Sequence, residues 1–320
     1  MNPKFAKATD NPVLGGALGT CFDVSVLAEN GAFRMWFSWR DKKAIALVES
    51  KDGINWSRNP KIAISGGSRR RTCFWRPKRR DVSRPCVIFH RGLYHLWYST
   101  HSRTIDIAYA ISKDGVRWKE RRKPVLSPEL AWEKDALMGP CVIYDDREQI
   151  FKMWYSGGGQ HEPDAVGYAT SRDGIEWIKH QANPIFAADP SLSWERDRAI
   201  GLHVVKAAGY YVGFYIGFAD GFEKACVGLA RSADGITNWE RYEGNPILLP
   251  GERGAWDDCN VYRPFVMCCG GSWMLWYNAS RFSDRVEQIG LATSDRLELD
   301  ELIWRRAAPA SAIQTAGQKL

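Results

Sequence analysis

One short aromatic segment recurs five times along the chain at nearly constant spacing. The five copies are Met35-Trp36-Phe37-Ser38, Leu96-Trp97-Tyr98-Ser99, Met153-Trp154-Tyr155-Ser156, Gly213-Phe214-Tyr215-Ile216 and Leu275-Trp276-Tyr277-Asn278. The aligned aromatic residues stand at 36, 97, 154, 214 and 276, so the steps are 61, 57, 60 and 62 residues. A period of this length is typical of repeat architectures in which one supersecondary unit is copied.

A turn motif follows each aromatic segment. Ser-x-Asp-Gly followed by Trp occupies residues 50–56, 112–118, 171–177 and, one residue longer, 232–239. The fifth copy keeps Ser294-Asp295 without the glycine, and Trp304 follows late. Asp-Gly between two apolar runs predicts a tight hairpin, because glycine accepts the positive φ that the turn needs. Serine and aspartate side chains bond nearby amides in such turns. We therefore interpret these residues as structural.

Each copy ends in an X-Pro step that suits a strand end or a crossing between repeats. Between the markers lie short alternating strands and no long helical period. Four strands per copy, in a meander, predict an all-β five-bladed β-propeller with four antiparallel strands per blade. We expect one domain over residues 1–320. Its predicted blades span approximately 10–62, 63–126, 127–188, 189–249 and 250–306, with a C-terminal tail at 307–320.

Charge and cysteine content limit the partners. The net charge is +7, and seven of the basic residues lie between Arg69 and Arg80. Such a cluster attracts phosphate, carboxylate or nucleic acid, or is simply a solvated loop. We predict that the protein binds neither nucleic acid nor a membrane. The sequence does not indicate an oligomeric state. The N-terminus shows no apolar stretch of signal-peptide length, and the eight cysteines show no zinc-type spacing. We therefore expect reduced thiols, a cytoplasmic protein and no metal site.

The topology of a propeller predicts where a site lies. The first strand of each blade begins on the same face as the loops between second and third strands, at the mouth of the central channel. The aligned mouth positions are Asp23, Arg84, Gly139, Gly201 and Arg263. Buried charge is costly unless it is paired or wetted. One carboxylate and two guanidiniums therefore indicate either a ligand site or an ion-pair ring that plugs the channel.

Further candidates lie upstream of the first strands and on the loops. Trp-acid pairs begin at Trp132, Trp194 and Trp256, and Asp135 and Asp197 follow two of them. We expect each tryptophan to pack between blades, with the acids facing the mouth or capping a turn. The candidate substrate-binding residues are Trp39, Arg84, His101, His161, His203, Glu223 and Arg263.

With these motifs, residues from about 10 to 305 resemble the five-bladed propellers of glycoside hydrolase families 43 and 32. The resemblance implies a sugar bound at the channel mouth, acidic catalytic residues, and calcium at the channel by analogy. It also implies that Asp23, in Asp23-Val24-Ser25-Val26, acts as base or nucleophile. Gly139 replaces the family's third-blade aspartate, and its glutamate would fall at Met138 or Ile200. The acid must then come from elsewhere, and the candidates are Asp135, Glu162, Asp197 and Glu223.

Three functions follow from these residues. The first is a glycoside hydrolase, whose two carboxylates stand roughly 6.5–9.5 Å apart when the reaction inverts the anomeric centre. The second is a glycoside phosphorylase or a transferase on a phosphorylated or acidic sugar, because arginine binds phosphate in bidentate fashion. The third is a non-catalytic propeller that binds a glycan or a protein.

Overall fold

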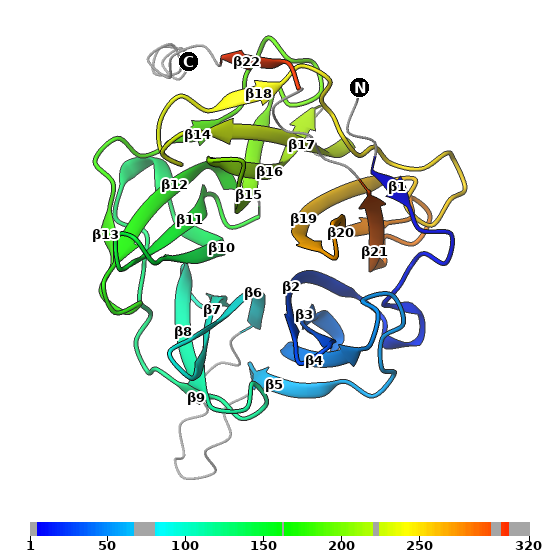
Figure 1. Cartoon of the computed structure of the whole chain (residues 1–320), viewed down its shortest axis with the longest axis horizontal. Coiled ribbons are helices and arrows are strands. Elements are labelled where there is room, and N and C mark those ends of the chain that lie inside the picture. The colour runs from blue at the N-terminus through cyan, green and yellow to red at the C-terminus, as the bar shows by residue number, and fades with distance from the viewer. Residues whose placement is uncertain (1–4, 67–80, 162, 220–223, 296–301, 307–320) are drawn as a thin grey trace.

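The computed structural model describes residues 5–66, 81–161, 163–219, 224–295 and 302–306. Within these ranges the chain is built of β-strands and three single-turn 3₁₀ helices, with no α-helix. Figure 1 shows the strands gathered into five blades around a central axis, with the first strand of each blade innermost. The predicted all-β five-bladed propeller is confirmed.

The first three blades follow one another along the chain. The first blade comprises β2 (Cys21–Glu29), β3 (Ala32–Trp39), β4 (Ala44–Ser50) and β5 (Lys61–Ser65). The second comprises β6 (Asp81–His90), β7 (Leu93–His101), β8 (Ile105–Ser112) and β9 (Lys119–Glu120). The third comprises β10 (Ala136–Asp145), β11 (Ile150–Gly158), β12 (Pro163–Ser171), β13 (Ile178–Lys179) and β14 (Phe186–Ala187). Consecutive long strands in each blade pair antiparallel.

The last two blades each include a strand from near one end of the chain. The fourth blade comprises β15 (Arg198–Ala207), β16 (Tyr210–Ala219), β17 (Lys224–Ser232), β18 (Glu240–Tyr242) and β22 (Trp304–Arg306). The fifth comprises β19 (Asn260–Cys269), β20 (Ser272–Ser280), β21 (Glu287–Ser294) and β1 (Ala6–Lys7). The N-terminal strand thus closes the fifth blade. Residues 304–306, which the sequence assigned to the fifth repeat, pair instead with β18 of the fourth blade.

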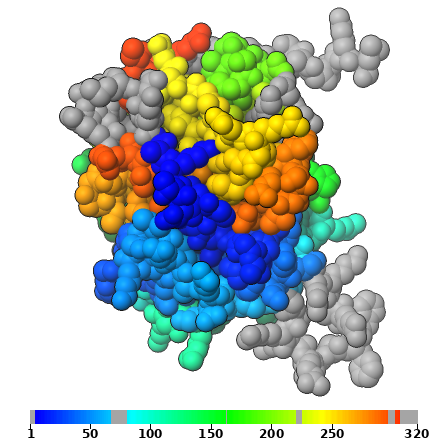
Figure 2. Space-filling model, turned by 90° about the vertical axis from the view of Figure 1, so that its right-hand side faces the viewer, coloured from blue at the N-terminus to red at the C-terminus, as the bar shows by residue number. Residues whose placement is uncertain are grey.

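This closure brings the ends of the described chain onto neighbouring blades. Ala6 pairs with Thr293, and Leu14 forms a further bridge with Ile289. Figure 2 shows the N-terminal residues, in dark blue, packed between blue segments of the first blade and orange segments of the fifth. The N-terminal strand pairs with the fifth blade, and the chain then continues directly into the first blade. This connection closes the ring of blades and stabilises it.

The conserved order of motifs is explained by contacts between successive blades. The indole Nε1 of each marker tryptophan donates to the carbonyl oxygen of the Asp-Gly turn in the next blade. The pairs are Trp36 to Gly115 (3.0 Å), Trp97 to Gly174 (2.8 Å), Trp154 to Gly235 (2.7 Å) and Trp276 to Gly53 (3.0 Å). The fourth blade has Phe214 instead, and the fifth blade, which would accept its bond, is the one without the turn glycine. Donor and acceptor are thus absent together.

The Trp-acid pairs are structural. Glu133 accepts a hydrogen bond from the Tyr155 hydroxyl (2.8 Å) and forms an ion pair with Lys179 (2.7 Å). Glu195 accepts from the Tyr215 hydroxyl and from Arg241 (2.6 Å). Asp257 stands in the same relation to Tyr277 (3.3 Å) and Lys7 (2.5 Å). All three acids are buried and paired with a cation, which compensates the cost of burying their charge.

Candidate functional site

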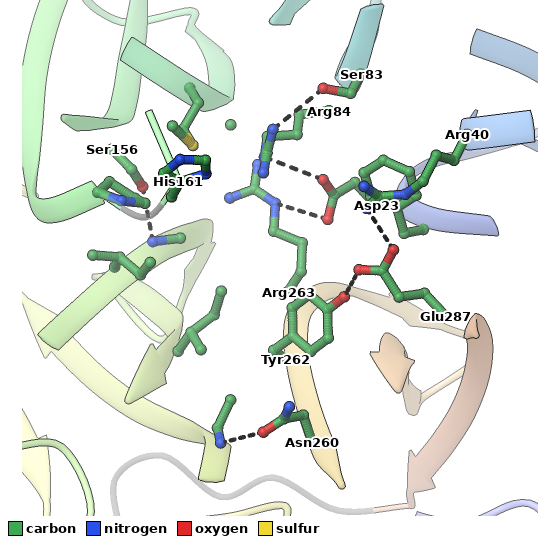
Figure 3. A pocket seen from close by; sticks show the side chains of 18 of the residues that line it. Asp23, Arg40, Ser83, Arg84, Ser156, His161, Asn260, Tyr262, Arg263 and Glu287 are labelled. Atoms are coloured by element: carbon green, nitrogen blue, oxygen red, sulfur yellow. Dashed lines mark hydrogen bonds and ion pairs between the residues drawn. The ribbon is translucent and has the colours of Figure 1, made fainter. Parts of the chain in front are cut away.

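A cavity of about 690 Å³ opens at the channel mouth and is lined by residues from all five blades. Its walls include two consecutive residues near the start of each innermost strand. These pairs are Phe22–Asp23, Ser83–Arg84, Met138–Gly139, Ile200–Gly201 and Tyr262–Arg263. The loops between second and third strands contribute Arg40, Lys43, Gln160, His161 and Arg285. Figure 3 shows the polar side of this cavity, where side chains from different blades point toward one another.

A β-bulge places both residues of each pair on the cavity. The register of each innermost strand shifts at this point, which is the mark of an extra residue in the strand. The second residue has positive φ in every blade: 48° at Asp23, 57° at Arg84, 61° at Gly139, 64° at Gly201 and 53° at Arg263. This conformation costs an ordinary L-residue about 1–2 kcal/mol and glycine almost nothing. Three blades therefore carry charged side chains at a strained position.

The marker serine of one blade holds the bulge of the next. The backbone N–H groups of Arg84, Gly139 and Gly201 donate to Ser38 (2.8 Å), Ser99 (3.1 Å) and Ser156 (2.9 Å), respectively. In the fifth blade Asn278 replaces the serine, and its Oδ1 accepts the N–H of Asp23 at 2.8 Å. Asn278 Nδ2 also donates to Asp23 Oδ1 at 2.6 Å. The amide therefore fixes both the backbone and the carboxylate of Asp23.

Asp23 lies between two guanidiniums. Its side chain is 5% exposed, and Oδ2 lies 3.3 Å from Arg84 Nε while Oδ1 lies 4.0 Å from Arg263 Nε. Arg84 Nη1 donates in addition to Ser83 Oγ at 3.3 Å. Figure 3 shows the two arginines reaching Asp23 from different blades. One carboxylate thus faces two cations, which leaves local positive charge for an anion to neutralise.

The Arg263 side chain crosses the mouth toward the third and fourth blades. A Cβ atom on Gly139 would lie 2.6 Å from both Nη atoms of Arg263, and one on Gly201 would lie 3.3 Å from Nη1. Real Cβ contacts are not found at the first distance. Gly139 and Gly201 therefore do more than accept positive φ, because their missing side chains make room for the guanidinium.

A second carboxylate, Glu287 of β21, lies on the same side of the cavity. It forms an ion pair with Arg40 (2.6 Å) and accepts the hydroxyl hydrogen of Tyr262. Burial, and after it the Glu287 carboxylate, raises the pKa of Tyr262 well above its ordinary value of 10.0. Tyr262 therefore remains a hydrogen-bond donor at any physiological pH.

His101, at the end of β7, is a neutral group in this cavity. Its Nε2 lies 3.0 Å from Ser83 Oγ. Burial, followed by the charge of Arg84, lowers the pKa of His101 from 6.5 to about 4. Nearby, Asp81 forms an exposed ion pair with Lys43 at 3.1 Å. Every carboxylate among the described lining residues thus has a cationic partner.

The wall toward the third and fourth blades is different in character. Its apolar members are Met138, Pro163, Ile200, Ile216, Phe218 and Ala225. Ile200, Ile216, Phe218 and Ala225 form one apolar cluster, and Met138 packs with Ile105 and Ala136 in another. The described cavity therefore has a charged half, from the fifth, first and second blades, and a largely apolar half.

The structure brings together some of the residues singled out in the sequence. Asp23, Arg84, His101, His161 and Arg263 all line the cavity. His161 is exposed at its rim. Their catalytic and binding roles stay predictions, and only their convergence is seen.

Four other candidates lie away from the cavity. Trp39 donates its indole N–H to the Leu18 carbonyl at 2.7 Å and packs on Phe37. His203 packs on Phe265 between the fourth and fifth blades, and its Nε2 lies 2.9 Å from the Val266 carbonyl oxygen. Asp135 and Asp197 are exposed and do not line the cavity. The reason is that each follows an acid, Glu133 or Glu195, which turns inward to a tyrosine.

The remaining candidates, Glu162, Glu223 and the Arg69–Arg80 cluster, lie outside the described residues. Within the described ranges, no three His, Cys, Asp or Glu side chains are grouped to hold a metal ion. The paired carboxylates of the cavity also do not form a donor set for the calcium that the resemblance implied. No helix in the described part of the chain is long and apolar enough to cross a membrane. A cytoplasmic location stays a prediction.

Sequence reasoning missed several residues of the site. Ser83 and Tyr262 immediately precede the aligned mouth residues, and the bulge turns them toward the cavity as well. Asn278 could be seen in the sequence as an amide at the marker position where three other copies have serine. Because the marker side chain of one blade accepts the backbone N–H of the mouth residue in the next, Asn278 of the fifth blade is the expected partner of Asp23 in the first.

The fold defines a class: it is a five-bladed β-propeller like those of solved glycoside hydrolase structures. A solved structure of a thermostable family-43 glycoside hydrolase superposes with a TM-score of 0.71 over 93% of this chain and 96% of the other. Sequence identity is 19%, so this likeness concerns the fold alone. The expected resemblance in fold is confirmed. No protein-family model matches the chain.

The sequence relatives include an uncharacterized protein and a named enzyme. An uncharacterized protein, MT1551 of Mycobacterium tuberculosis, is 30% identical over 148 residues, which are 42% of this chain. That alignment spans 45% of the relative, so less than half of its length is matched. A 1,2-beta-oligomannan phosphorylase of Thermoanaerobacter sp. is 27% identical over 245 residues, which are 72% of this chain and 75% of the enzyme.

Proposed function

We propose that this chain is a carbohydrate-active enzyme that cleaves a glycosidic bond with inorganic phosphate as the acceptor. The observation that carries the proposal is the convergence of Arg84 and Arg263 on the single carboxylate of Asp23. Among the described lining residues, five are cationic and three are carboxylates: Arg40, Lys43, Arg84, Arg263 and Arg285 against Asp23, Asp81 and Glu287. Surplus guanidinium groups in a cavity favour an anion with several acceptor oxygens, such as phosphate.

The chemistry suits a site with one central carboxyl group. Hydrolysis by inversion needs a base to activate water and an acid for the leaving oxygen. Phosphate is already an anionic nucleophile, so it needs only the acid. When phosphate binds the two guanidiniums as H2PO4⁻, it displaces Asp23 from them and passes one of its protons to that carboxylate. A phosphate oxygen then bonds to the anomeric carbon as the glycosidic C–O bond breaks. The Asp23 proton passes to the leaving oxygen, and the ionised Asp23 pairs with arginine again.

The names of two similar proteins support a carbohydrate substrate, and one of them supports phosphate as the acceptor. The Thermoanaerobacter enzyme, whose alignment covers about three quarters of each chain, is named as a phosphorylase of an oligosaccharide. The family-43 structure is named as a glycoside hydrolase. Carbohydrate as the substrate class is common to both names, and the charged half of the cavity favours the phosphorylase.

Product analysis tests the proposal. The purified chain would be incubated with a panel of sugar 1-phosphates and acceptor sugars, and released phosphate and new disaccharide would be measured. The expected result is matched release of phosphate and disaccharide, reversed by added phosphate with formation of the sugar 1-phosphate. Cleavage of an oligosaccharide at the same rate in phosphate-free buffer, with free sugar as the only product, contradicts phosphorolysis.

Hydrolysis is the second candidate, and one observation favours it. Glu287 supplies a further carboxylate to the same half of the cavity as Asp23, held by Arg40 and Tyr262. In that reaction Asp23 would be the base and Glu287 the acid. Loss of phosphate-independent hydrolysis in Glu287→Gln, with unchanged sugar binding, would identify this mechanism. Sugar binding without any turnover would instead indicate a glycan-binding propeller.

A further inference from the structure

The apolar half of the cavity departs from the pattern of the other blades. At the first residue of the bulge pair, the second and fifth blades carry the polar Ser83 and Tyr262, whereas the first, third and fourth carry Phe22, Met138 and Ile200. At the marker position, four blades carry serine or asparagine, and the fourth blade carries Ile216. The described lining residues of the fourth blade are thus all apolar, whereas the third blade is apolar at the first position alone and keeps Ser156, Gln160 and His161 in the lining.

Ile216 is placed to act on a ligand as well as on the fold. Its Cδ1 lies 2.6 Å from the point where a Cβ on Gly201 would stand, so the side chain lies over the bulge of the fourth blade and lines the cavity. Serine at this position in the first three blades bonds the backbone of the following blade. The fourth blade gives up that interaction and presents a branched apolar side chain beside Ile200 and Phe218.

A sugar hydroxyl directed at the fourth-blade part of this wall, away from Ser156, Gln160 and His161, would lose its hydrogen bonds to water and find no described partner on Ile200, Ile216 or Phe218. Burial of an unpaired hydroxyl costs about 1–3 kcal/mol in proteins. A C–H or methyl group in the same place gains instead from leaving water. The wall therefore selects for a ligand edge without hydroxyls.

We propose that the sugar taken by this cavity is a deoxy or O-methylated glycoside, whose deoxy or methyl edge packs on Met138, Ile200 and Ile216. The inference rests on the proposed function, since it assumes a sugar in the cavity. The charged half, around Asp23, Arg84 and Arg263, holds the phosphate and the reacting bond. The apolar half then sets which sugar enters.

Matched pairs of glycosides test the inference. Binding of 4-nitrophenyl β-D-fucoside and β-D-galactoside, which differ only by the C6 hydroxyl, would be measured by calorimetry in phosphate-free buffer, so that no phosphorolysis takes place. The 6-deoxy-β-D-mannoside and β-D-mannoside pair, and each parent sugar with its mono-O-methyl derivatives, would be measured in the same way. The expected result is that the deoxy or methylated member of at least one pair binds about 10-fold to 100-fold more tightly.

Variants tie the preference to the wall. Ile216→Ser, the residue found there in three other blades, should bring the two members of the pair toward equal affinity and leave phosphate affinity unchanged. Ile178→Ser, at a site 75% exposed on the outer strand β13, should keep the preference. Ile200→Thr, which stays β-branched and introduces a hydroxyl, replaces Ile216→Ser if that variant unfolds.

The outcomes separate the inference from the proposed function. Equal binding within every pair, or tighter binding of the hydroxylated members, overturns the inference and leaves a phosphorylase of ordinary sugars. A preference that survives in both Ile216→Ser and Ile200→Thr also overturns it, because the wall is then not its source. Failure of every sugar to bind overturns the proposed function together with the inference.

Discussion

Arg84 Nε lies 3.3 Å from Asp23 Oδ2, and both residues stand at the equivalent bulge position of neighbouring blades with φ near 50°. Neither side chain is needed to form the bulge, since Gly139 and Gly201 form it in the third and fourth blades at less cost. The ion pair therefore exists because two strained positions each present a charge to the channel mouth. Strain retained at a ligand cavity is a common property of functional sites.

The first prediction concerns the carboxylate. Asp23→Asn keeps the shape and the contact with Asn278 but cannot transfer a proton. We expect turnover on the substrate identified by the sugar 1-phosphate screen to fall by about 100-fold or more, the usual contribution of a general acid. Asp135→Asn, at an exposed site outside the cavity, is the control and should keep full activity. Equal activity of Asp23→Asn and wild type would remove Asp23 from the reaction.

The second prediction concerns the space for Arg263. Gly139→Ala places a methyl group 2.6 Å from the guanidinium at a residue with φ of 61°. Gly92→Ala adds the same methyl group at φ of 79° with nothing within 4 Å, so it reports backbone strain alone. Both variants should lose about 1–2 kcal/mol of unfolding free energy. Only Gly139→Ala should also raise the KM for phosphate, and an unchanged KM would mean that Arg263 does not bind it.

The third prediction concerns the tryptophan that joins blades. Trp154→Phe leaves the buried Gly235 carbonyl without the indole that donates to it at 2.7 Å, and should cost about 1–3 kcal/mol beyond the loss of packing. Trp239→Phe is the matched control, because Trp239 is also buried (3% exposed, against 0% for Trp154) and its Nε1 has no hydrogen-bond partner. Denaturant unfolding measures the difference. Equal losses in the two variants would show that the indole hydrogen bond contributes little.

The fourth prediction concerns pH. Burial, before any charge, lowers the pKa of both His101 and His203 from 6.5 to about 4. The unfolded chain therefore binds more protons than the folded chain between about pH 4 and 6.5. Stability is full above pH 6.5 and falls as the pH drops through this window, by up to about 1.4 kcal/mol per pH unit for each histidine. His203→Gln, which can still donate to Val266, should make this fall shallower; an unchanged slope contradicts the assignment.

The propeller was predictable because its markers are local and repeated. Trp36, Trp97, Trp154 and Trp276 recur at a fixed distance from Asp-Gly turns, and both signals arise from short-range physics. The closure was not predictable, because β1 and β22 are very short strands whose partners lie more than sixty residues away. Their placement depends on which blade edge remains unpaired once the ring has formed.

The site was predictable in part for the same reason. Alignment of the repeats found Asp23, Arg84 and Arg263, because a position near the axis recurs in every blade. It favoured Asp135 and Asp197 as possible catalytic acids, because an acidic run does not show which member turns inward. Glu133 and Glu195 turn inward to tyrosines that lie about twenty residues further along the chain. Long-range pairing of this kind leaves no local signal.

Phosphate binding by the free protein tests the central claim most directly. Calorimetric titration of the whole chain with inorganic phosphate should show one saturable site. Arg263→Gln should weaken that site strongly, whereas Arg172→Gln, exposed at a hairpin on the opposite face, should leave it unchanged. A chain that binds no phosphate, or an Arg263→Gln variant that binds it as tightly as wild type, would contradict a phosphate site between Arg84 and Arg263.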